Sequence, residues 1–381
     1  MKKRLVLVGG GHAHLSVLRA LANQRPAGLD VVLITPSRHQ NYSGMLPGWV
    51  AGHYPLPACR IDLEPLVQAA GARLVLDQMV GMDAARRCVA LKDGKQVDYD
   101  LLSLDVGSET DTSWLEVLGN KLLPIKPLDN FFASWPHILA AAKARKGYQL
   151  VVVGGGAAGV EMALAALQAF ASAGVDARVD LVASETGLLP GHTKNVQTRV
   201  LRFARQAGLG LHFLHGVGTE DGVLLADGHL LQADQVIAAT GARAPVWLAS
   251  SKLGLDEQGY ILVDQYHRSV SHPNVFAAGD VCARSDALMS RSGVHAVHAG
   301  PVLAANLLAL HSGAALQAYA PRQRSLYLLA CGPRYAVASW GRWSAEGKWV
   351  WRWKDWIDRR FIQRFSKTSH GQTAQMLENT P

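Results

Sequence analysis

The chain has 381 residues, is 49% hydrophobic and 18% charged, and carries a formal net charge of +8. This composition predicts a globular protein of two or three domains, and it excludes collagen-like, low-complexity and disulfide-stapled chains. The charge excess is local, because residues 321–365 hold ten Lys and Arg against three Asp and Glu, so we expect no nucleic-acid partner.

The first predicted unit is a strand, a glycine turn, a helix and a second strand. Residues 5–8 form a short buried strand that Gly9, Gly10 and Gly11 end. A helix follows at about 14–22, and residues 31–34 form the next strand, which ends at Thr35. The apolar run is too short for a signal peptide. The order is that of a dinucleotide-binding βαβ unit, although His14 stands where the fingerprint has its third glycine.

The second predicted unit repeats this order with a complete glycine fingerprint. Gly154, Gly156 and Gly159 lie between a strand at 150–153 and an Ala/Leu-rich helix at about 157–173. The first glycine permits the tight turn, the second lets the backbone approach a pyrophosphate, and the third lets the helix pack on the strand. The next strand, 179–183, ends without an acid, so Glu185 is the only candidate for a ribose contact and the choice between NADH and NADPH stays open.

Each unit continues in the same way downstream. In the first unit, a hairpin-like segment at 87–94 leads to a strand that ends in Gly107. In the second unit, a similar segment at 222–228 leads to a strand that ends in Gly241. The sequence therefore predicts the α/β class with two tandem Rossmann-like domains. A third segment at 259–280 precedes a long helix at about 295–310, whose histidines, Pro301 and Asn306 argue against a membrane span.

The C-terminal part is rich in tryptophan and arginine. Strands are predicted at 325–330 and 334–340, and tryptophan at every second position of 349–353 predicts another. A helix with one apolar face follows, and the final segment, 366–381, is predicted to be disordered. The apolar face comprises Trp353, Trp356, Ile357, Phe361 and Phe365, and the polar residues opposite include Lys354, Asp358, Arg359 and Gln363.

These features together resemble a known family. Segments 5–14, 38–48, 154–161, 239–241, 277–280 and 353–361 are similar to flavoproteins related to type II NADH:quinone and sulfide:quinone oxidoreductases. The chain resembles more closely the pyridine-nucleotide oxidoreductase domain that some bacteria fuse to selenide, water dikinase. The resemblance implies FAD and NAD(P)H as cofactors, a quinone or other small electron acceptor, and a separate dikinase as a partner.

The resemblance also implies a domain plan. It gives FAD-binding segments at 1–112 and 246–320, an inserted NAD(P)H-binding domain at 113–245, and a C-terminal module at 321–365 that docks to a membrane or a partner. Glu161, His295 and Lys126 become candidate catalytic residues, although Lys126 as an exposed loop residue and His295 as a packing residue are open alternatives. The residues implied in cofactor binding are Gly9, Gly10, Gly11, His12, Ala13, His14, Thr35, Tyr42, Ser43, Met45, Leu46, Pro47, Gly107, Gly154, Gly155, Gly156, Ala157, Gly159, Glu185, Thr240, Gly241, Gly279, Asp280 and Val294.

Further expectations concern chemistry, location and assembly. The cysteines lack redox-motif spacing, and no metal site is predicted. Cys282 and Cys331 are either buried thiols or, in an alternative function, nucleophiles of a sulfide or selenide:quinone oxidoreductase. A third hypothesis is a redox regulator of selenophosphate synthesis. The tryptophans and arginines of the C-terminal module favour a cytoplasmic protein, peripheral on the inner face of the membrane, over a merely solvated surface. A homodimer is left open.

Overall fold

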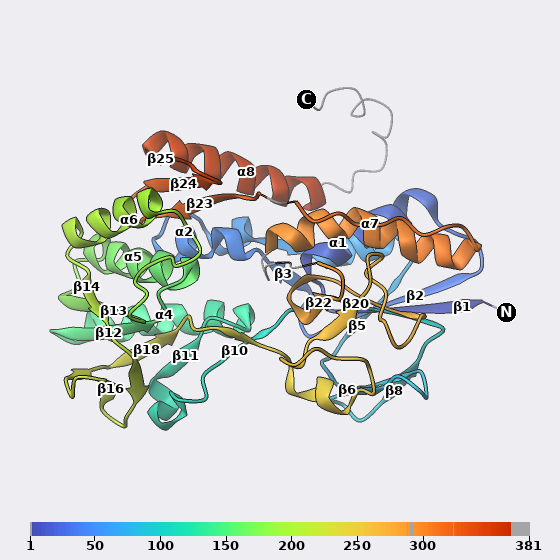
Figure 1. Cartoon of the computed structure of the whole chain (residues 1–381), viewed down its shortest axis with the longest axis horizontal. Coiled ribbons are helices and arrows are strands. Elements are labelled where there is room, and N and C mark those ends of the chain that lie inside the picture. The colour runs from blue at the N-terminus through green and yellow to red at the C-terminus, as the bar shows by residue number, and fades with distance from the viewer. Residues whose placement is uncertain (1, 288, 290–292, 323, 367–381) are drawn as a thin grey trace.

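The computed structural model describes residues 2–287, 289, 293–322 and 324–366, so almost all of the predicted disordered tail lies outside the described residues. Two parallel sheets lie side by side, and the C-terminal elements cross above both (Figure 1). The fold is therefore mixed α/β with two Rossmann-like units, as the sequence predicts.

The first sheet has five parallel strands in the order β21-β9-β1-β2-β5. Residues 5–8 of β1 and 31–34 of β2, in the centre of the sheet, are apolar and buried, which is typical of a parallel sheet covered on both faces. Helix α1 begins directly after the glycine turn of β1 and packs against α7. The bounds are β1 Lys3–Val8, α1 His12–Gln24, β2 Leu29–Thr35, α3 Leu63–Ala69, β5 Arg73–Leu76, β9 Leu101–Leu104, β21 Val275–Ala277 and α7 Gly293–Ser312.

The second sheet repeats this architecture in the order β11-β18-β12-β13-β14, again with parallel pairs. A small antiparallel sheet accompanies each large one, β6-β7-β8 in the first unit and β15-β16-β17 in the second. The bounds are β11 Leu122–Pro124, α4 Leu128–Ala144, β12 Tyr148–Val153, α5 Ala157–Ser172, β13 Ala177–Ala183, α6 Lys194–Gln206, β14 Gly210–Phe213, β18 Gln235–Ala238, β6 Met79–Asp83, β7 Cys88–Leu91, β8 Gln96–Asp98, β15 Gly216–Gly218, β16 Gly222–Leu225 and β17 Leu230–Gln232.

The chain crosses between the two units on a two-stranded antiparallel pair, β10 with β19. These crossings lie within three residues of the predicted boundaries at 112 and 245, which stay predictions. Two other short pairs, β3 with β4 and β20 with β22, complete the first unit. The bounds are β3 His39–Asn41, α2 Leu46–Val50, β4 Arg60–Asp62, β10 Glu109–Thr110, β19 Ala242–Arg243, β20 Ile261–Val263 and β22 Cys282–Arg284.

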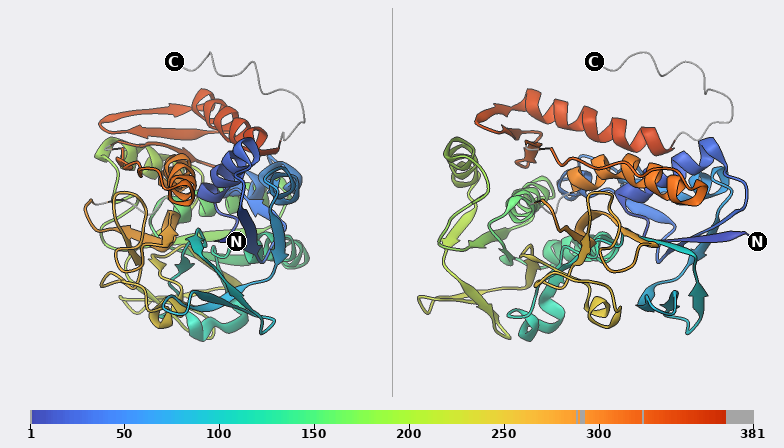
Figure 2. Two further views of the ribbon diagram at one scale, coloured as in Figure 1. Left: turned by 90° about the vertical axis from the view of Figure 1, so that its right-hand side faces the viewer. Right: turned by 45° about the vertical axis from the view of Figure 1, so that its right-hand side comes forward.

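The C-terminal elements are three antiparallel strands, β23 (Leu326–Ala330), β24 (Ala336–Trp340) and β25 (Trp343–Gly347), followed by one helix, α8 (Lys348–Ser366). Figure 2 shows α8 lying across the top of the molecule. The prediction of a strand at 349–353 is wrong, because these residues form the first turns of α8. Alternation over five residues does not separate a strand from a helix. In the helix, Trp349 and Trp353 are one turn apart and their rings stack at 6.4 Å.

The polar face predicted for this helix is also partly wrong. Lys354 and Asp358 are only 9% and 4% exposed, and they share the buried side of α8 with Val350 and Ile362. These positions follow the four-residue spacing of one helical face. Trp356, predicted on the apolar face, is exposed instead. A periodicity argument sorts residues by polarity, so it could not place an ion pair on the inner side.

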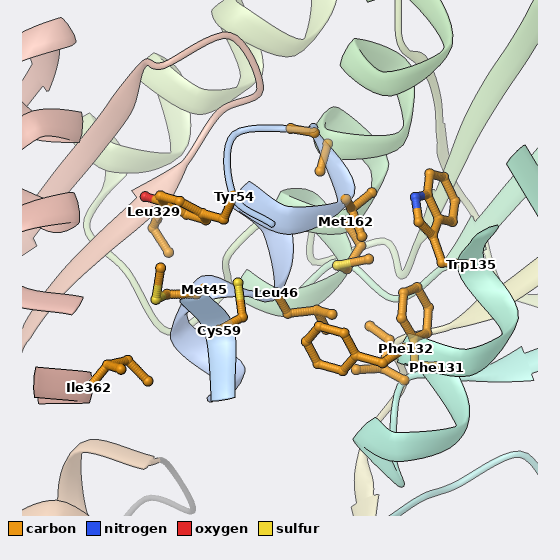
Figure 3. Packing of buried hydrophobic residues seen from close by; sticks show 14 of the residues in the cluster. Met45, Leu46, Tyr54, Cys59, Phe131, Phe132, Trp135, Met162, Leu329 and Ile362 are labelled. Carbon is orange, nitrogen blue, oxygen red and sulfur yellow. The ribbon is translucent and has the colours of Figure 1, made fainter. Parts of the chain in front are cut away.

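One hydrophobic core connects all three parts of the chain. Figure 3 shows Leu46 on the side of Phe132 of α4, and Met45 on the opposite side, toward Leu329 of β23 and Ile362 of α8. The side chains of Met45, Leu46 and Pro47, which the resemblance implied as flavin neighbours, are therefore part of the core. The C-terminal module is fixed to the body by the same core.

Helix α7 is long and apolar enough to cross a membrane by length and composition alone. It packs against α1 within the first unit, and it contains Pro301. Its Asn306 is fully buried and donates hydrogen bonds to the carbonyls of Tyr266 and Gln317, both at 2.9 Å. These contacts make α7 a core helix of the fold.

Candidate functional site

The first glycine turn lies between β1 and α1 and approaches the end of β9. Gly9 has a φ of +90°, and a Cβ there would lie 2.3 Å from the carbonyl oxygen of Asp105. A Cβ at Gly11 would lie 2.3 Å from the carboxyl carbon of the same aspartate. Glycine is therefore required at both positions, as the fingerprint predicts, but part of the reason is a carboxylate that the sequence argument missed.

Asp105 caps the N-terminus of α1 across the turn. Its Oδ2 accepts hydrogen bonds from the backbone N–H groups of Ala13 (2.8 Å) and His14 (3.0 Å). Burial raises the pKa of Asp105 to about 6, although these hydrogen bonds act in the opposite direction. The sequence feature that could have identified Asp105 is its position at the carboxyl end of β9, the strand beside β1. Ligands of parallel sheets bind at this edge.

His14 fills the position of the missing third glycine as a structural group. Its Nδ1 lies 2.6 Å from the carbonyl oxygen of Gly9, and its Nε2 lies 2.8 Å from the hydroxyl of Ser103. Burial lowers the pKa of His14 to about 4, so the ring is neutral. A carbonyl only accepts, so Nδ1 donates to Gly9 and Nε2 accepts from Ser103. Both ring nitrogens are thus used between helix and sheet.

His12 points to the other side of the turn. Its ring lies 5.5 Å from those of Tyr42 and Phe361, and Tyr42 stacks on Phe361 at 4.6 Å. Burial lowers the pKa of His12, and its Nε2 has no hydrogen-bond partner among the residues that the structure describes. A buried polar atom without a partner marks a place where a ligand atom can bind.

Helix α8 contacts the loop at Tyr42 through a buried polar network. The ammonium group of Lys354 lies 2.6 Å from Oδ2 of Asp358 and donates to the carbonyl of Gly44 at 2.5 Å. The hydroxyl of Tyr42 donates to the other carboxylate oxygen of Asp358 at 3.1 Å. Burial raises the pKa values of Tyr42 and Asp358. The loop therefore depends on the C-terminal helix for its conformation.

Two other predicted residues meet although they are far apart in the sequence. The ammonium group of Lys126 lies 2.6 Å from Oδ2 of Asp280 and 3.1 Å from the hydroxyl of Ser108. Gly279, beside this aspartate, has a φ of +73°, and a Cβ there would lie 2.7 Å from Oδ1 of Asp105. Lys126 is therefore part of the first cluster and is not a freely exposed loop residue.

The second glycine turn has the geometry that its fingerprint predicts. A Cβ at Gly154 would lie 2.2 Å from the carbonyl oxygen of Ala239, and one at Gly159 would lie 1.9 Å from that of Gly154. A Cβ at Gly156 would meet nothing within 4 Å, so the space before the turn is open. The N-cap residue of α5 is Gly156, which has no side chain that could cap the helix. This helix end is therefore available to an anion.

Glu161 lies one turn into α5 and points toward the C-terminal module. Its Oε1 accepts a hydrogen bond from the backbone N–H of Ala330 in β23 at 2.7 Å. Burial raises the pKa of Glu161 to about 7, and the charge of Lys354 opposes that change. A carboxyl group with this pKa can hold or release a proton near neutral pH.

The remaining predicted residues divide between these clusters and the surface. Thr35 is buried at the end of β2, and the Thr240 hydroxyl donates to the carbonyl of Asp111. Glu185 is exposed after β13. His295 is only 7% exposed and faces a separate cavity between the second unit and the C-terminal module. Among the described residues, no cluster of three or more His, Cys, Asp or Glu could hold a metal. The carbonyl of Gly241 accepts a hydrogen bond from the N–H of Asp111 at 2.9 Å. Ser43 is exposed, and Gly107, Ala157 and Val294 are partly buried.

The family of pyridine nucleotide-disulphide oxidoreductases matches residues 3–301. The chain belongs to this family. A probable ferredoxin reductase of Castellaniella defragrans is 28% identical over 298 residues, which is 74% of this chain and 68% of that protein. An NADH dehydrogenase-like protein of Mycobacterium tuberculosis is 28% identical over 304 residues, covering 74% and 73%.

Two solved structures extend the likeness into the C-terminal module. The NDH2 of Plasmodium falciparum in complex with NADH has a TM-score of 0.80 at 13% identity, covering 96% of this chain and 99% of that one. The sulfide:quinone oxidoreductase of Aquifex aeolicus has a TM-score of 0.78 at 17% identity, covering 96% and 91%. At these identities the likeness shows a shared fold.

The family uses FAD and NAD(P)H, and both glycine turns fit a dinucleotide. At the second turn, the uncapped end of α5 and the open space at Gly156 fit a pyrophosphate. At the first turn, Asp105 takes the N–H groups of Ala13 and His14, so those of Gly11 and His12 are left for a phosphate. A protonated Asp105 removes the repulsion between its carboxylate and that phosphate.

The four cysteines of the chain are buried side chains. No disulfide links the four cysteines, all of which are buried within the described residues. Cys282 and Cys331 are 1% and 0% exposed. Burial raises the pKa of Cys331, which disfavours its reactive thiolate form.

Proposed function

We propose that this oxidoreductase takes electrons from NAD(P)H through FAD and passes them to a quinone-type acceptor. When bound, FAD supplies hydride acceptance and the transfer of electrons. The first turn, with Gly11, His12 and Asp280, would hold FAD, and the second, with Gly154 to Gly159, would hold NAD(P)H. The observation that carries the proposal is Glu161. This half-buried carboxyl with a pKa of about 7 lies on the helix of the second turn and bonds the C-terminal module.

The residues of the chain have separate tasks in this scheme. The second turn orients the nicotinamide nucleotide through backbone N–H groups. Lys126 holds Asp280 in place, while Tyr42, Lys354 and Asp358 fix the loop beside the first turn. Glu161 holds or releases the proton that accompanies the electrons at the acceptor. The core that contains Met45 and Leu46 excludes water behind this loop.

Rapid mixing of the FAD-loaded protein with NADH or NADPH tests the donor half of the proposal. We expect loss of the oxidised flavin absorbance band, and recovery of the band when a short-chain quinone is added. A flavin that stays oxidised at every donor concentration contradicts the first half. A reduced flavin that quinone does not reoxidise, but another acceptor does, contradicts the second.

We also propose peripheral membrane attachment on the cytoplasmic side through the C-terminal module. Trp340, Trp343, Trp349 and Trp356 are 45 to 57% exposed, and Arg360 lies over the ring of Trp356 at 5.4 Å. Exposed tryptophan beside arginine suits an interface with anionic lipid, where each basic group contributes about 1 kcal/mol.

Vesicles of anionic lipid test this attachment. The double variant Trp349→Ser/Trp356→Ser should lose most of the binding and keep its flavin. The control Val117→Ser/Val246→Ser removes two exposed apolar side chains outside the module and should bind as the unchanged protein does. Equal binding of all three proteins would show that the tryptophans have another role.

The alternative sulfide or selenide donor is less well supported by the site, because the thiols it needs are buried. A Cys282→Ser/Cys331→Ser variant with undiminished NAD(P)H-dependent turnover and undiminished sulfide-dependent turnover removes the cysteine mechanism. The separate dikinase partner rests on the sequence resemblance alone, and a pull-down with purified selenide, water dikinase tests it.

A further inference from the structure

A cavity of about 500 Å³ lies where three parts of the chain meet. Residues 191–193 of the second unit form one wall, and His295 in the first turn of α7 forms another. The third wall comes from the C-terminal module and consists of Pro321, Arg322, Arg324, Ser325, Tyr327, Ser339 and Gly341. The cofactor turns described above contribute none of the lining residues.

The lining of this cavity is rich in nitrogen donors. His192, His295, Arg322 and Arg324 face it together with the hydroxyl-bearing side chains of Tyr327 and Ser339. The described lining contains no Asp or Glu and no large aliphatic side chain. This chemistry does not suit a quinone ring and its tail, and it suits a polar anion.

The two arginines have no acidic partner among the described residues, as no ion pair to Arg322 or Arg324 is found there. Two arginines of α6, in contrast, form ion pairs with an acid. Arg199 and Arg202 of α6 both lie 2.5 Å from Oε1 of Glu346. The charge of Arg322 and Arg324 is therefore not balanced by an acid among the described lining residues of the cavity.

The inner wall of the cavity contains two histidines with defined surroundings. His295 is 7% exposed, and its Nδ1 has no hydrogen-bond partner in the described part of the chain. His192 is oriented by a 2.9 Å hydrogen bond between its Nδ1 and the hydroxyl of Ser339. Its ring also packs edge-on against Tyr327 at 5.2 Å. A buried imidazole nitrogen without a partner beside two uncompensated arginines is the arrangement of a ligand site.

We propose that this cavity binds the phosphate group of a small ligand. Arg322 and Arg324 supply the charge, and His295 and Tyr327 supply directed hydrogen bonds. The wall is connected to the second glycine turn, because the N–H of Leu189 donates to the carbonyl of Gly155 at 2.7 Å and that of His192 to Leu189 at 2.9 Å. The phosphate is therefore either the ribose phosphate of NADPH or that of a separate phosphorylated molecule.

Calorimetric titration of the FAD-loaded protein with inorganic phosphate tests the site. The variant Arg322→Gln/Arg324→Gln should bind at least roughly tenfold more weakly, since each charge-assisted hydrogen bond contributes more than one tenfold step. The control Arg86→Gln/Arg205→Gln removes two exposed arginines elsewhere and should bind within about twofold of the unchanged protein. Flavin content and thermal midpoint confirm that both variants are folded.

The same proteins distinguish the two sources of phosphate. A loss of NADPH affinity with unchanged NADH affinity assigns the cavity to the cofactor phosphate. Unchanged affinity for both nucleotides, with loss of inorganic phosphate binding, assigns it to a separate ligand. Inorganic phosphate that binds the cavity variant as well as the unchanged protein, or that binds neither, overturns the proposal. None of these measurements requires turnover, so they stand apart from the proposed electron transfer.

Discussion

The substitution Asp105→Asn tests the unexpected acid at the first glycine turn. Asparagine keeps an oxygen that can accept from the N–H groups of Ala13 and His14, and it removes the charge. Burial raises the pKa of Asp105 from 3.8 to about 6, so the folded protein holds this proton more tightly than the unfolded chain does. The free energy of unfolding should therefore fall as pH rises between about 4 and 6, and the whole cost is present at pH 7.

The size of this cost follows from the same two values. A pKa raised from 3.8 to about 6 corresponds to about 3 kcal/mol. The neutral amide accepts more weakly from a helix N-terminus than a carboxylate does, which reduces the expected stabilisation by about 1 kcal/mol. Asp105→Asn should therefore stabilise the flavin-free protein by about 2 kcal/mol at pH 7 and change little at pH 4.

Urea unfolding of the flavin-free protein at several pH values between 4 and 8 measures this difference. The exposed Asp98→Asn serves as control and should follow the curve of the unchanged protein. FAD titration adds a second readout, because removal of a negative charge beside the first turn should strengthen FAD binding above pH 6. Parallel stability curves for Asp105→Asn and the unchanged protein across this range would refute the reasoning.

Three other predictions follow from the buried groups. Lys354→Met should destabilise the protein by about 3–5 kcal/mol in urea unfolding, because Asp358 is left buried without its cation. The double variant Lys354→Met/Asp358→Leu should recover most of this loss. A double variant as unstable as the single one contradicts the paired role. The rate of flavin reoxidation by quinone should change with pH around 7, and Glu161→Gln should abolish that change; a retained transition assigns it to another group. An aromatic disulfide reagent should not label the native protein and should label all four cysteines after unfolding in guanidinium, so rapid native labelling would contradict their burial.

The parts of the fold that the sequence predicted are those in which local chemistry decides the outcome. Gly9 and Gly154 adopt backbone angles that favour glycine, so the two strand–turn–helix units could be found without any tertiary information. The two parallel sheets followed from the repeat of these units. These are the arguments that the structure and the family match confirm.

The errors and omissions concern long-range contacts. Asp105 lies 91 and 92 residues from the two N–H groups that it accepts from, and no local pattern links them. Lys354 and Asp358 looked like surface residues because polarity was the only available criterion, whereas their partners Gly44 and Tyr42 lie more than 300 residues away. Likewise, only the assembled chain places His192 beside Arg322. Burial of polar groups depends on partners that sequence spacing does not reveal.

The contact between α8 and the Tyr42 loop would make the proposed surface binding and the proposed cofactor binding thermodynamically interdependent. Helix α8 carries the exposed Trp349 and Trp356 and also holds the loop beside the first turn through Lys354 and Asp358. Any binding partner that favours the ordered position of α8 also favours the ordered loop, and reciprocity requires the same coupling free energy in the opposite direction. With this coupling free energy, the protein would hold its cofactor more tightly on a surface than in solution. The same free energy would weaken surface binding when the cofactor is lost.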